Sequence, residues 1–264
     1  GGGGGGSGGG AGSGDGNAGA GGNGNGTDAN GDGSAAGSCG QGSQGRCPNH
    51  GQGTTAGDPV DVATGRVYTV PVVDLLLPGV LPLRFARTYS SFARKRDVGL
   101  GYGWTHSYAW EARVGRTGLR VHKPDGTHLD FPPFERHEER VSTGSVRVRR
   151  QGDGFVVATD DFVFHVLRPS KLDPDRYLLA EVYDLNGNRI TLEYDDDLLV
   201  GLTDPVGRRV RLTRDPAPGA TTLQVFDAAA GAWVTFAHYA KDERGNLRSV
   251  EDADGHLTRF TYAD

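Results

Sequence analysis

The sequence predicts an all-β protein built from antiparallel hairpins and preceded by a disordered glycine-rich tail. After Gly57, apolar residues recur mainly at every second position in short runs. Turn sequences such as Asp125-Gly126, Asn186-Gly187 and Asp254-Gly255 separate these runs and supply glycine where positive φ is needed. No window keeps the three- and four-residue apolar spacing of an amphipathic helix. Together these observations favour strands over helices throughout the foldable part.

Residues 1–57 differ in composition from the rest of the chain. They hold 26 of the 44 glycines in a chain of 264 residues. A segment with so few apolar side chains cannot bury enough surface to offset the entropy lost on ordering, so we expect it to be disordered. Gly5-Gly6-Ser7-Gly8-Gly9 matches a nucleophile elbow in letters, but a glycine tract provides neither the strand nor the helix that this motif requires. We interpret residues 1–57 as a linker.

The foldable part contains fifteen segments with strand-like alternation, each bounded by Gly, Pro, Asn or Asp. In chain order they are 67–73, 81–89, 108–114, 119–122, 128–131, 145–149, 155–158, 162–167, 177–182, 190–194, 209–213, 221–226, 233–239, 247–251 and 258–262. We expect the last of these strands to leave an unpaired apolar edge that promotes association of the chain.

A repeated turn sequence, D-x-x-G, begins at Asp184, Asp204 and Asp252. Seven residues after the three turn glycines come Tyr194, Arg214 and Tyr262, respectively. Asp follows the first two of these residues. The spacing suggests a repeat of about twenty residues, with an insertion around 216–232 before the last turn. Each unit would be a hairpin with one apolar face that only neighbouring units can cover.

These repeats resemble the YD repeats of Rhs proteins, notably in YDLNGNRITLEYD at 183–195 and RGNL at 244–247. Upstream, GDPVDVATG at 57–65, LPLRFARTYSS at 81–91 and GLGYGW at 99–104 resemble the domain of unknown function that opens the Rhs core. The resemblance covers about residues 57–264. It divides the chain into a linker (1–57), the N-terminal domain of the Rhs core (58–135) and a YD-repeat region (136–264).

The Rhs resemblance implies a strip of β-sheet wound into a hollow, spiral shell. In related toxins such a shell encloses a C-terminal toxic domain. The implied partners are the remaining repeats and the C-terminal domain of the same polypeptide, together with secretion machinery or cell-surface glycans. The implied location is secreted or cell-surface. Because the chain begins with Gly and contains no Met, we expect it to be a piece of a longer protein.

Charge and hydropathy exclude two classes of partner. The net charge is −5, and the two signs are interspersed, so the sequence shows no basic footprint for nucleic acid or anionic lipid. No apolar run reaches the roughly 18 residues that a membrane-spanning helix needs. We therefore expect no nucleic-acid partner and no membrane span.

The metal-ligating residues of the sequence form no complete set. Cys39, Cys47 and His50 supply three ligands where a structural zinc site needs four, so a local disulfide is favoured over a metal and free thiols remain open. His137-Glu138-Glu139-Arg140 begins like a zinc-protease helix but lacks the second histidine. The other histidines are scattered, and we expect them to be solvated or half-buried: His106, His122, His128, His165, His238 and His256.

Two other groups of residues have competing interpretations. Tyr102, Trp104, Tyr108 and Trp110 could form an exposed platform for sugars, but we favour a buried corner in which Gly101 and Gly103 let the backbone turn. Arg87 shares the strand face of Leu83, Phe85 and Tyr89, so it needs a carboxylate partner.

The sequence therefore predicts no catalytic, cofactor-binding or metal-binding residue. We favour a structural, encapsulating role, with a carbohydrate- or cell-surface-binding module as the alternative and an enzyme as the least favoured class. Asp204-Pro205-Val206-Gly207 is similar to the self-cleavage motif of Rhs toxins, but Arg208 stands where that motif has an apolar residue. We expect this segment to be a turn and the chain not to cleave itself.

Overall fold

The computed structural model describes residues 60–133, 139–141, 146–215 and 219–262. The predictions made for residues 1–57, Cys39, Cys47, His50 and His137 lie outside these residues. The described elements all belong to one compact unit, residues 55–264. They are strands except for a single turn of 3-10 helix, η1 (Ser91–Ala93), so the all-β prediction is confirmed. None of the described helical structure is long and apolar enough to cross a membrane.

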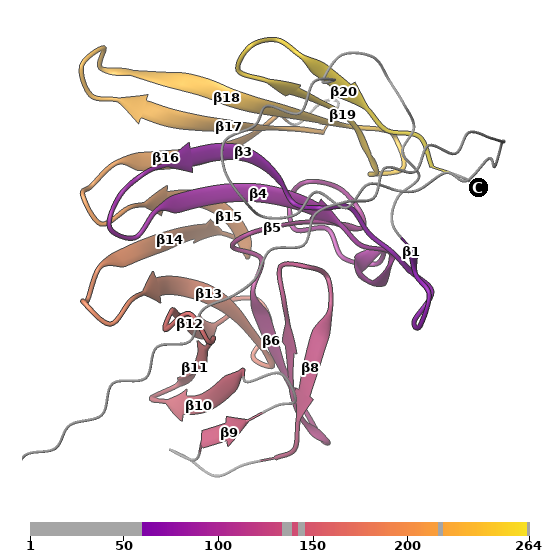
Figure 1. Ribbon diagram of the computed structural model, residues 1–264, viewed down its shortest axis with the longest axis vertical. Coiled ribbons are helices and arrows are strands. Elements are labelled where there is room, and N and C mark those ends of the chain that lie inside the picture. Colours follow the sequence, from indigo (N-terminus) through magenta and orange to yellow (C-terminus); the bar gives the residue numbers. More distant parts are fainter. Residues whose placement is uncertain (1–59, 134–138, 142–145, 216–218, 263–264) are drawn as a thin grey trace, which may run out of the picture. The chain divides into compact units, whose positions relative to one another are not determined.

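Twelve strands follow one another through the main sheet in sequence order, and each pairs antiparallel with the next (Figure 1). They are β9 (Glu139–Val141), β10 (Arg147–Gln151), β11 (Gly154–Ala158), β12 (Phe164–Pro169), β13 (Arg176–Tyr183), β14 (Arg189–Asp195), β15 (Leu198–Thr203), β16 (Arg209–Asp215), β17 (Ala220–Asp227), β18 (Ala232–Lys241), β19 (Leu247–Asp252) and β20 (Leu257–Arg259). The prediction of consecutive antiparallel hairpins is therefore confirmed.

The main sheet branches at β13. The second half of β13 pairs with β14, whereas its first half pairs with β6 (Glu111–Gly115), in the register Leu178 to Glu111. Two more strands, β7 (Gly118–His122) and β8 (His128–Phe131), extend this branch as a meander. The branch brings β6 beside residues more than sixty positions later in the chain.

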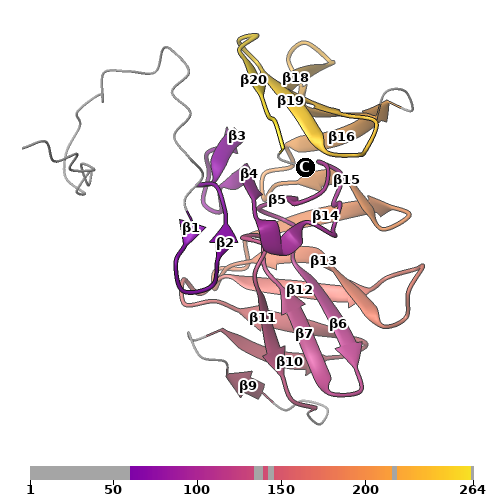
Figure 2. The same ribbon diagram turned by 90° about the vertical axis from the view of Figure 1, so that its right-hand side faces the viewer.

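A separate three-stranded sheet lies beside the middle of the main sheet (Figures 1 and 2). It contains β3 (Val72–Leu77), β4 (Leu83–Tyr89) and β5 (Trp104–His106), and a short ribbon of β1 (Val60–Asp61) and β2 (Arg66–Val67) precedes it. Strand β4 is buried along most of its length, because β3 and β5 flank it while its apolar side chains join the core of the main sheet. The two sheets therefore share one hydrophobic core.

The repeated D-x-x-G sequences all form the same turn. In the turn at Asp184, the Gly187 N–H donates to the Asp184 carbonyl, and Asp184 Oδ1 accepts the N–H groups of Asn186 and Asn188. Asp204 and Asp252 make the corresponding bonds. A fourth copy at Asp242 has the same bonds and was not among the predicted repeats. In each turn the aspartate therefore bonds only residues up to four positions later in the chain.

Several predicted strand boundaries are wrong. The predicted strand 67–73 is interrupted before Pro71, which cannot donate a ladder hydrogen bond, and β3 begins at Val72. Residues 108–110 precede β6 instead of opening it. The strand predicted at 221–226, inside the expected insertion, is confirmed: it is β17, which continues the sheet.

Four short or non-alternating strands were not predicted. They are β1, β5, β9 and β15.

Candidate functional site

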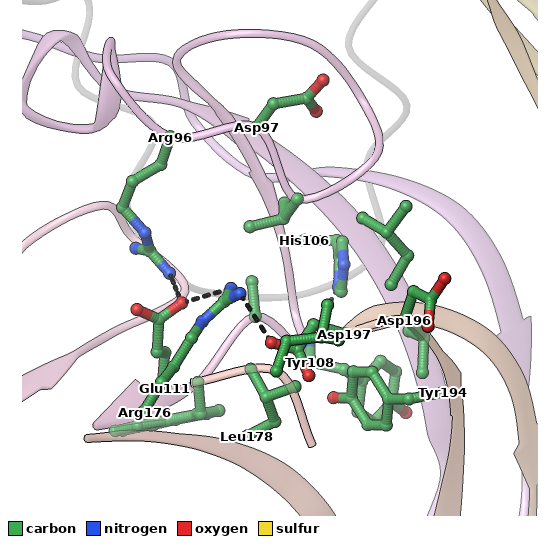
Figure 3. A pocket seen from close by; sticks show the side chains of 16 residues that line it. Arg96, Asp97, His106, Tyr108, Glu111, Arg176, Leu178, Tyr194, Asp196 and Asp197 are labelled. Carbon is green, nitrogen blue, oxygen red and sulfur yellow. Dashed lines mark hydrogen bonds and ion pairs between the residues drawn. The ribbon is translucent and has the colours of Figure 1, made fainter. Parts of the chain in front are cut away.

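The branch of the main sheet holds a group of charged side chains, which we call the branch cluster: Arg96, Glu111, Arg113, Arg176 and Asp197. Arg113 is 47% exposed, and the other four are mostly buried and are labelled in Figure 3. Glu111, the first residue of β6, lies at the centre of the cluster. Its Oε2 accepts hydrogen bonds from Arg176 Nη2 at 2.8 Å and Arg96 Nη2 at 3.3 Å, and its Oε1 accepts one from Arg113 Nε at 2.8 Å. One carboxylate therefore holds three guanidinium groups from three segments of the chain.

Asp197 extends the branch cluster to the turn between β14 and β15. Its Oδ2 accepts hydrogen bonds from Ser170 Oγ at 2.5 Å and Arg176 Nη1 at 3.2 Å. Asp196 and Asp197 form this two-residue turn with φ of 43° and 62°, a conformation that aspartate tolerates better than most residues. Arg176 therefore bridges two carboxylates from different sides of the branch.

Electrostatics keep Glu111 ionised. Burial raises its pKa, but the charges of Arg96 and Arg176 and the hydrogen bonds from Arg176 and Arg113 outweigh that effect, so the pKa lies below its ordinary value. Burial lowers the pKa of the Arg96 guanidinium, and the neighbouring charges of Arg176 and Arg113 lower it further against the opposing effect of Glu111. Repulsion among the arginines thus persists around the single central carboxylate.

A small cavity of about 140 Å³ lies on one side of the branch cluster, lined in part by His106, Tyr108 and Tyr194 (Figure 3). His106 stacks on Phe85, with ring centroids 5.0 Å apart, and its Nδ1 accepts the Tyr108 N–H. Burial lowers the pKa of His106 to about 3, so the imidazole is neutral at physiological pH. Burial also raises the pKa values of Tyr108 and Tyr194.

These contacts are suited to holding segments of the chain together. Glu111 is ionised and engaged by three donors, and neutral His106 is stacked and hydrogen-bonded, so neither group is poised to exchange a proton near neutral pH. The guanidinium–carboxylate contacts instead fix β6, β13, the Asp196–Asp197 turn and the loop at Arg96 to one another.

A second buried polar contact joins the three-stranded sheet to the main sheet. Arg87 Nη1 bonds Asp74 Oδ1, and the Tyr239 hydroxyl donates to Asp74 Oδ2 at 2.7 Å. The expected carboxylate partner of Arg87 is therefore confirmed, and it is Asp74. Asp74 is the extra residue where the register between β3 and β4 shifts, and such a bulge redirects its side chain.

The aromatic group at 102–110 is mostly interior, as predicted. Trp104, Tyr108 and Trp110 are buried, whereas Tyr102 is 44% exposed. Gly101 has φ of +107°, and a Cβ there would meet the Leu247 backbone nitrogen at 2.7 Å. The backbone passes too close to β19 for any other residue at this position.

Among the residues that the structure describes, His122 and His165 belong to no group with the spacing of metal ligands. His122 and His165 are partly buried, and burial lowers the pKa of each to about 4. Within the described residues, one group has the spacing of metal ligands: Asp252, Asp254 and His256. All three are exposed, Asp252 Oδ1 already accepts the N–H groups of Asp254 and His256, and its Oδ2 lies 3.3 Å from His256 Nδ1, so we assign no metal there.

Asp204 also acts as a turn cap. Its Oδ1 accepts the N–H groups of Val206 and Arg208, and its Oδ2 pairs with Arg208 Nε at 2.6 Å. Arg208 then donates from Nη2 to the Pro78 carbonyl at 2.7 Å. The geometry agrees with the predicted turn and gives Asp204 an arginine partner.

The branch cluster itself was not predicted from the sequence. Glu111 lies in a predicted strand, but the partners that bury it are at positions 96 and 176. The only local signal is the run Asp195-Asp196-Asp197, which is unusual at a hairpin turn and indicates that one carboxylate has a further role.

Comparison with known proteins finds a matching family and similar curated proteins. Residues 57–131 match the family described as "Domain of unknown function (DUF6531)". The chain is 26% identical over 242 residues to the double-stranded DNA deaminase toxin A of Burkholderia cenocepacia, an alignment that covers 82% of this chain and 16% of the relative. The chain thus spans about one sixth of the toxin that it resembles.

Two solved toxin assemblies are also similar, at a low level. The crystal structure of TcdB2-TccC3-Cdc42 aligns over 72% of this chain and 15% of its own, with 10% identity and a TM-score of 0.42. The Tc holotoxin pore of Photorhabdus luminescens aligns over 78% of this chain and 15% of its own, with 11% identity and a TM-score of 0.42. We base no conclusion on these two alignments. At the level of sequence, the chain is similar to part of a toxin polypeptide, and its N-terminal segment is similar to DUF6531.

Proposed function

We propose that this chain is a wall segment of an Rhs-type β-sheet shell that encloses a toxic domain carried elsewhere on the same, longer polypeptide. The observation that carries the proposal is the strict meander of β9–β20, in which every strand pairs with its sequence neighbours. Such a strip grows by adding hairpins, and each new hairpin covers the edge left by the previous one. Register shifts within β12–β13, β14–β15, β17–β18 and β18–β19 add the bends that a curved wall requires.

The similarity to a deaminase toxin supports a place in a toxin polypeptide, but we do not assign deamination to this segment. Zinc deaminases require a P-C-x-x-C pair of ligands. The two cysteines here, Cys39 and Cys47, are separated by seven residues. We likewise propose that the Asp204 turn does not cleave the chain, because its carboxylate is held by backbone N–H groups and Arg208.

The test is the structure of the complete polypeptide by cryo-electron microscopy. We expect β20 to pair with a following strand and the sheet to continue around an enclosed domain. Secretion of that polypeptide, measured in culture medium, is the expected companion result. A complete polypeptide in which residues 60–262 form an isolated domain, with the β20 edge in solvent, would contradict the proposal.

A carbohydrate- or cell-surface-binding module remains the alternative, and one observation favours it. Tyr102 is exposed, as an aromatic platform requires. Other tryptophans fit less well: Trp104 of the same aromatic group is buried, and on β18 the Arg211 guanidinium covers Trp233 at 4.1 Å from its ring centroid. A glycan array on the wild-type chain and Tyr102→Ala tests this alternative, which requires a signal that the substitution abolishes.

A further inference from the structure

A second cavity lies beside the branch cluster and shares Arg96, Glu111 and Arg176 with the first. It has a volume of about 300 Å³ and is lined by Lys95, Arg96, Asp97, Val98, Glu111, Arg113, His122 and Arg176. This volume is about ten times the roughly 30 Å³ that one water molecule occupies in the liquid. The cavity can therefore hold a small ion together with some of its hydration water.

The lining of this cavity is predominantly cationic. Lys95, Arg96, Arg113 and Arg176 face two carboxylates, Asp97 and Glu111. Asp97 is directed elsewhere, since its Oδ1 accepts the N–H groups of Gly99 and Gly101 and its Oδ2 pairs with Lys241 at 2.8 Å. Glu111 remains as the one carboxylate shared by the three arginines.

Two of the four cations, Arg113 and Arg176, have a second carboxylate partner among the described residues, and the other two do not. Arg113 pairs with Asp173, and Arg176 pairs with Asp197. Arg96 has Glu111 alone, and within the described residues no acceptor lies within hydrogen-bond distance of its Nη1. Lys95 is exposed and makes no ion pair with the described residues. The excess positive charge is therefore concentrated on Lys95 and Arg96, two successive residues that line the cavity.

We propose that this cavity binds a small oxyanion of the size of inorganic phosphate or sulfate, held by Lys95 and Arg96 with Arg113 and Arg176 behind them. Guanidinium and ammonium groups are the preferred protein partners of such anions. The ion would relieve the mutual repulsion of arginines that share one carboxylate. Neutral His122, on β7, adds a hydrogen-bond donor at the cavity wall. This inference is independent of the proposed shell function.

The experiment measures the midpoint of thermal unfolding of the 264-residue chain in sodium phosphate, sodium sulfate and sodium chloride at equal ionic strength. Phosphate and sulfate also stabilise proteins by exclusion from the surface, an effect that does not saturate. We expect a saturable rise that follows ligand binding to the native state, and a matching affinity by calorimetry. The imidazole resonances of His122 should shift with the same affinity.

Substitutions locate the ion. Lys95→Gln should weaken phosphate binding about two- to fivefold, as expected for one exposed charge, and should leave the midpoint in chloride unchanged. Arg96→Gln should weaken it about tenfold or more. The matched control is Arg168→Gln, which removes an exposed arginine that pairs with Asp153 and does not line the cavity, so this variant should bind like the wild type.

The proposal is overturned if phosphate and sulfate stabilise no more than chloride. It is also overturned if Lys95→Gln binds phosphate as tightly as the wild type or if Arg168→Gln loses as much affinity, because the ion would then be bound elsewhere. Because Lys95 is exposed, this variant keeps the test valid even if Arg96→Gln fails to fold.

Discussion

The N-terminal part, residues 60–131, and the meander β9–β20 are both antiparallel β-structure, but they are held by different kinds of contact. The meander turns are capped by aspartates that bond residues two and four positions away. The N-terminal part is fixed by side chains that reach 122 to 165 positions along the chain, such as Thr221 to Gly99 and Tyr239 to Asp74. Local chemistry therefore forms the repeats, and long-range polar contacts attach the N-terminal part to them.

The largest expected effect comes from breaking the Asp74–Arg87–Tyr239 contact. Asp74→Ala leaves a buried arginine without its carboxylate and a buried tyrosine hydroxyl without its acceptor. We expect the free energy of unfolding to fall by about 3–5 kcal/mol, measured by urea denaturation. The control is Asp153→Ala, which breaks an exposed pair with Arg168 and should cost less than about 1 kcal/mol. Equal losses of stability in the two variants would contradict the view that long-range buried polar contacts hold the N-terminal part.

The second effect is a pH dependence from His106. Its pKa is about 3 in the folded chain against 6.5 in the unfolded chain, so the unfolded state gains a proton first as the pH falls. The stability is therefore fully present above pH 6.5 and declines towards pH 3, by about 1.4 kcal/mol per pH unit for this group.

His106→Phe should remove that part of the slope between pH 6.5 and pH 4.5, and Glu111 contributes equally to both proteins. His122 and His165, whose pKa values burial lowers to about 4, contribute equally to both proteins. Urea denaturation at a series of pH values measures the difference, and pH 7.5–8.5 is the internal control, since both forms should be flat there. An unchanged slope in the variant would show that His106 is not held neutral.

The same contrast explains what the sequence could predict. Alternation and glycine turns predicted the hairpins, and the strand at 128–131 has the predicted bounds. Strand β15 escaped prediction because its preceding turn, Asp196–Asp197, contains no glycine and its residues are mostly apolar without alternation. Arg87 was expected to need a carboxylate, yet Asp74 could not be identified, because a bulge in β3 breaks the alternation that sequence reasoning uses.

The branch cluster was beyond sequence reasoning for a similar reason. Glu111 acquires Arg176 as a partner only when β6 pairs with β13, a choice of strand neighbour that no local pattern specifies. An alternating strand such as β6 can join any sheet edge of suitable length. The position of the cluster therefore follows from tertiary pairing.

A smaller effect separates two copies of the same turn. Asp252 caps an exposed turn, whereas Asp204 is buried and its partner Arg208 also bonds the Pro78 carbonyl in the N-terminal part. Asp204→Ala should cost about 2–3 kcal/mol because buried donors lose their acceptor, and Asp252→Ala, which removes only an exposed turn cap, should cost clearly less. Urea denaturation of both variants measures the difference, with Asp184→Ala as a second exposed copy. Equal costs would mean that the contact of Arg208 with Pro78 adds nothing to the turn.

The smallest expected effect is a gain in stability. It concerns the turn between β14 and β15, where a local turn also makes a long-range contact with Arg176. Asp196 and Asp197 both have positive φ, which strains a residue with a Cβ, but only Asp197 bonds Arg176 and Ser170. Asp196→Gly should therefore raise the free energy of unfolding by about 0.5 kcal/mol, since relief of strain exceeds the added flexibility of the unfolded chain. Asp197→Gly relieves the same strain but leaves Arg176 with one carboxylate fewer, so it should lower stability by about 1–2 kcal/mol. Urea denaturation of the pair at pH 7 measures both signs, and a gain in both variants would show that the Asp197 bonds contribute less than the strain in the turn.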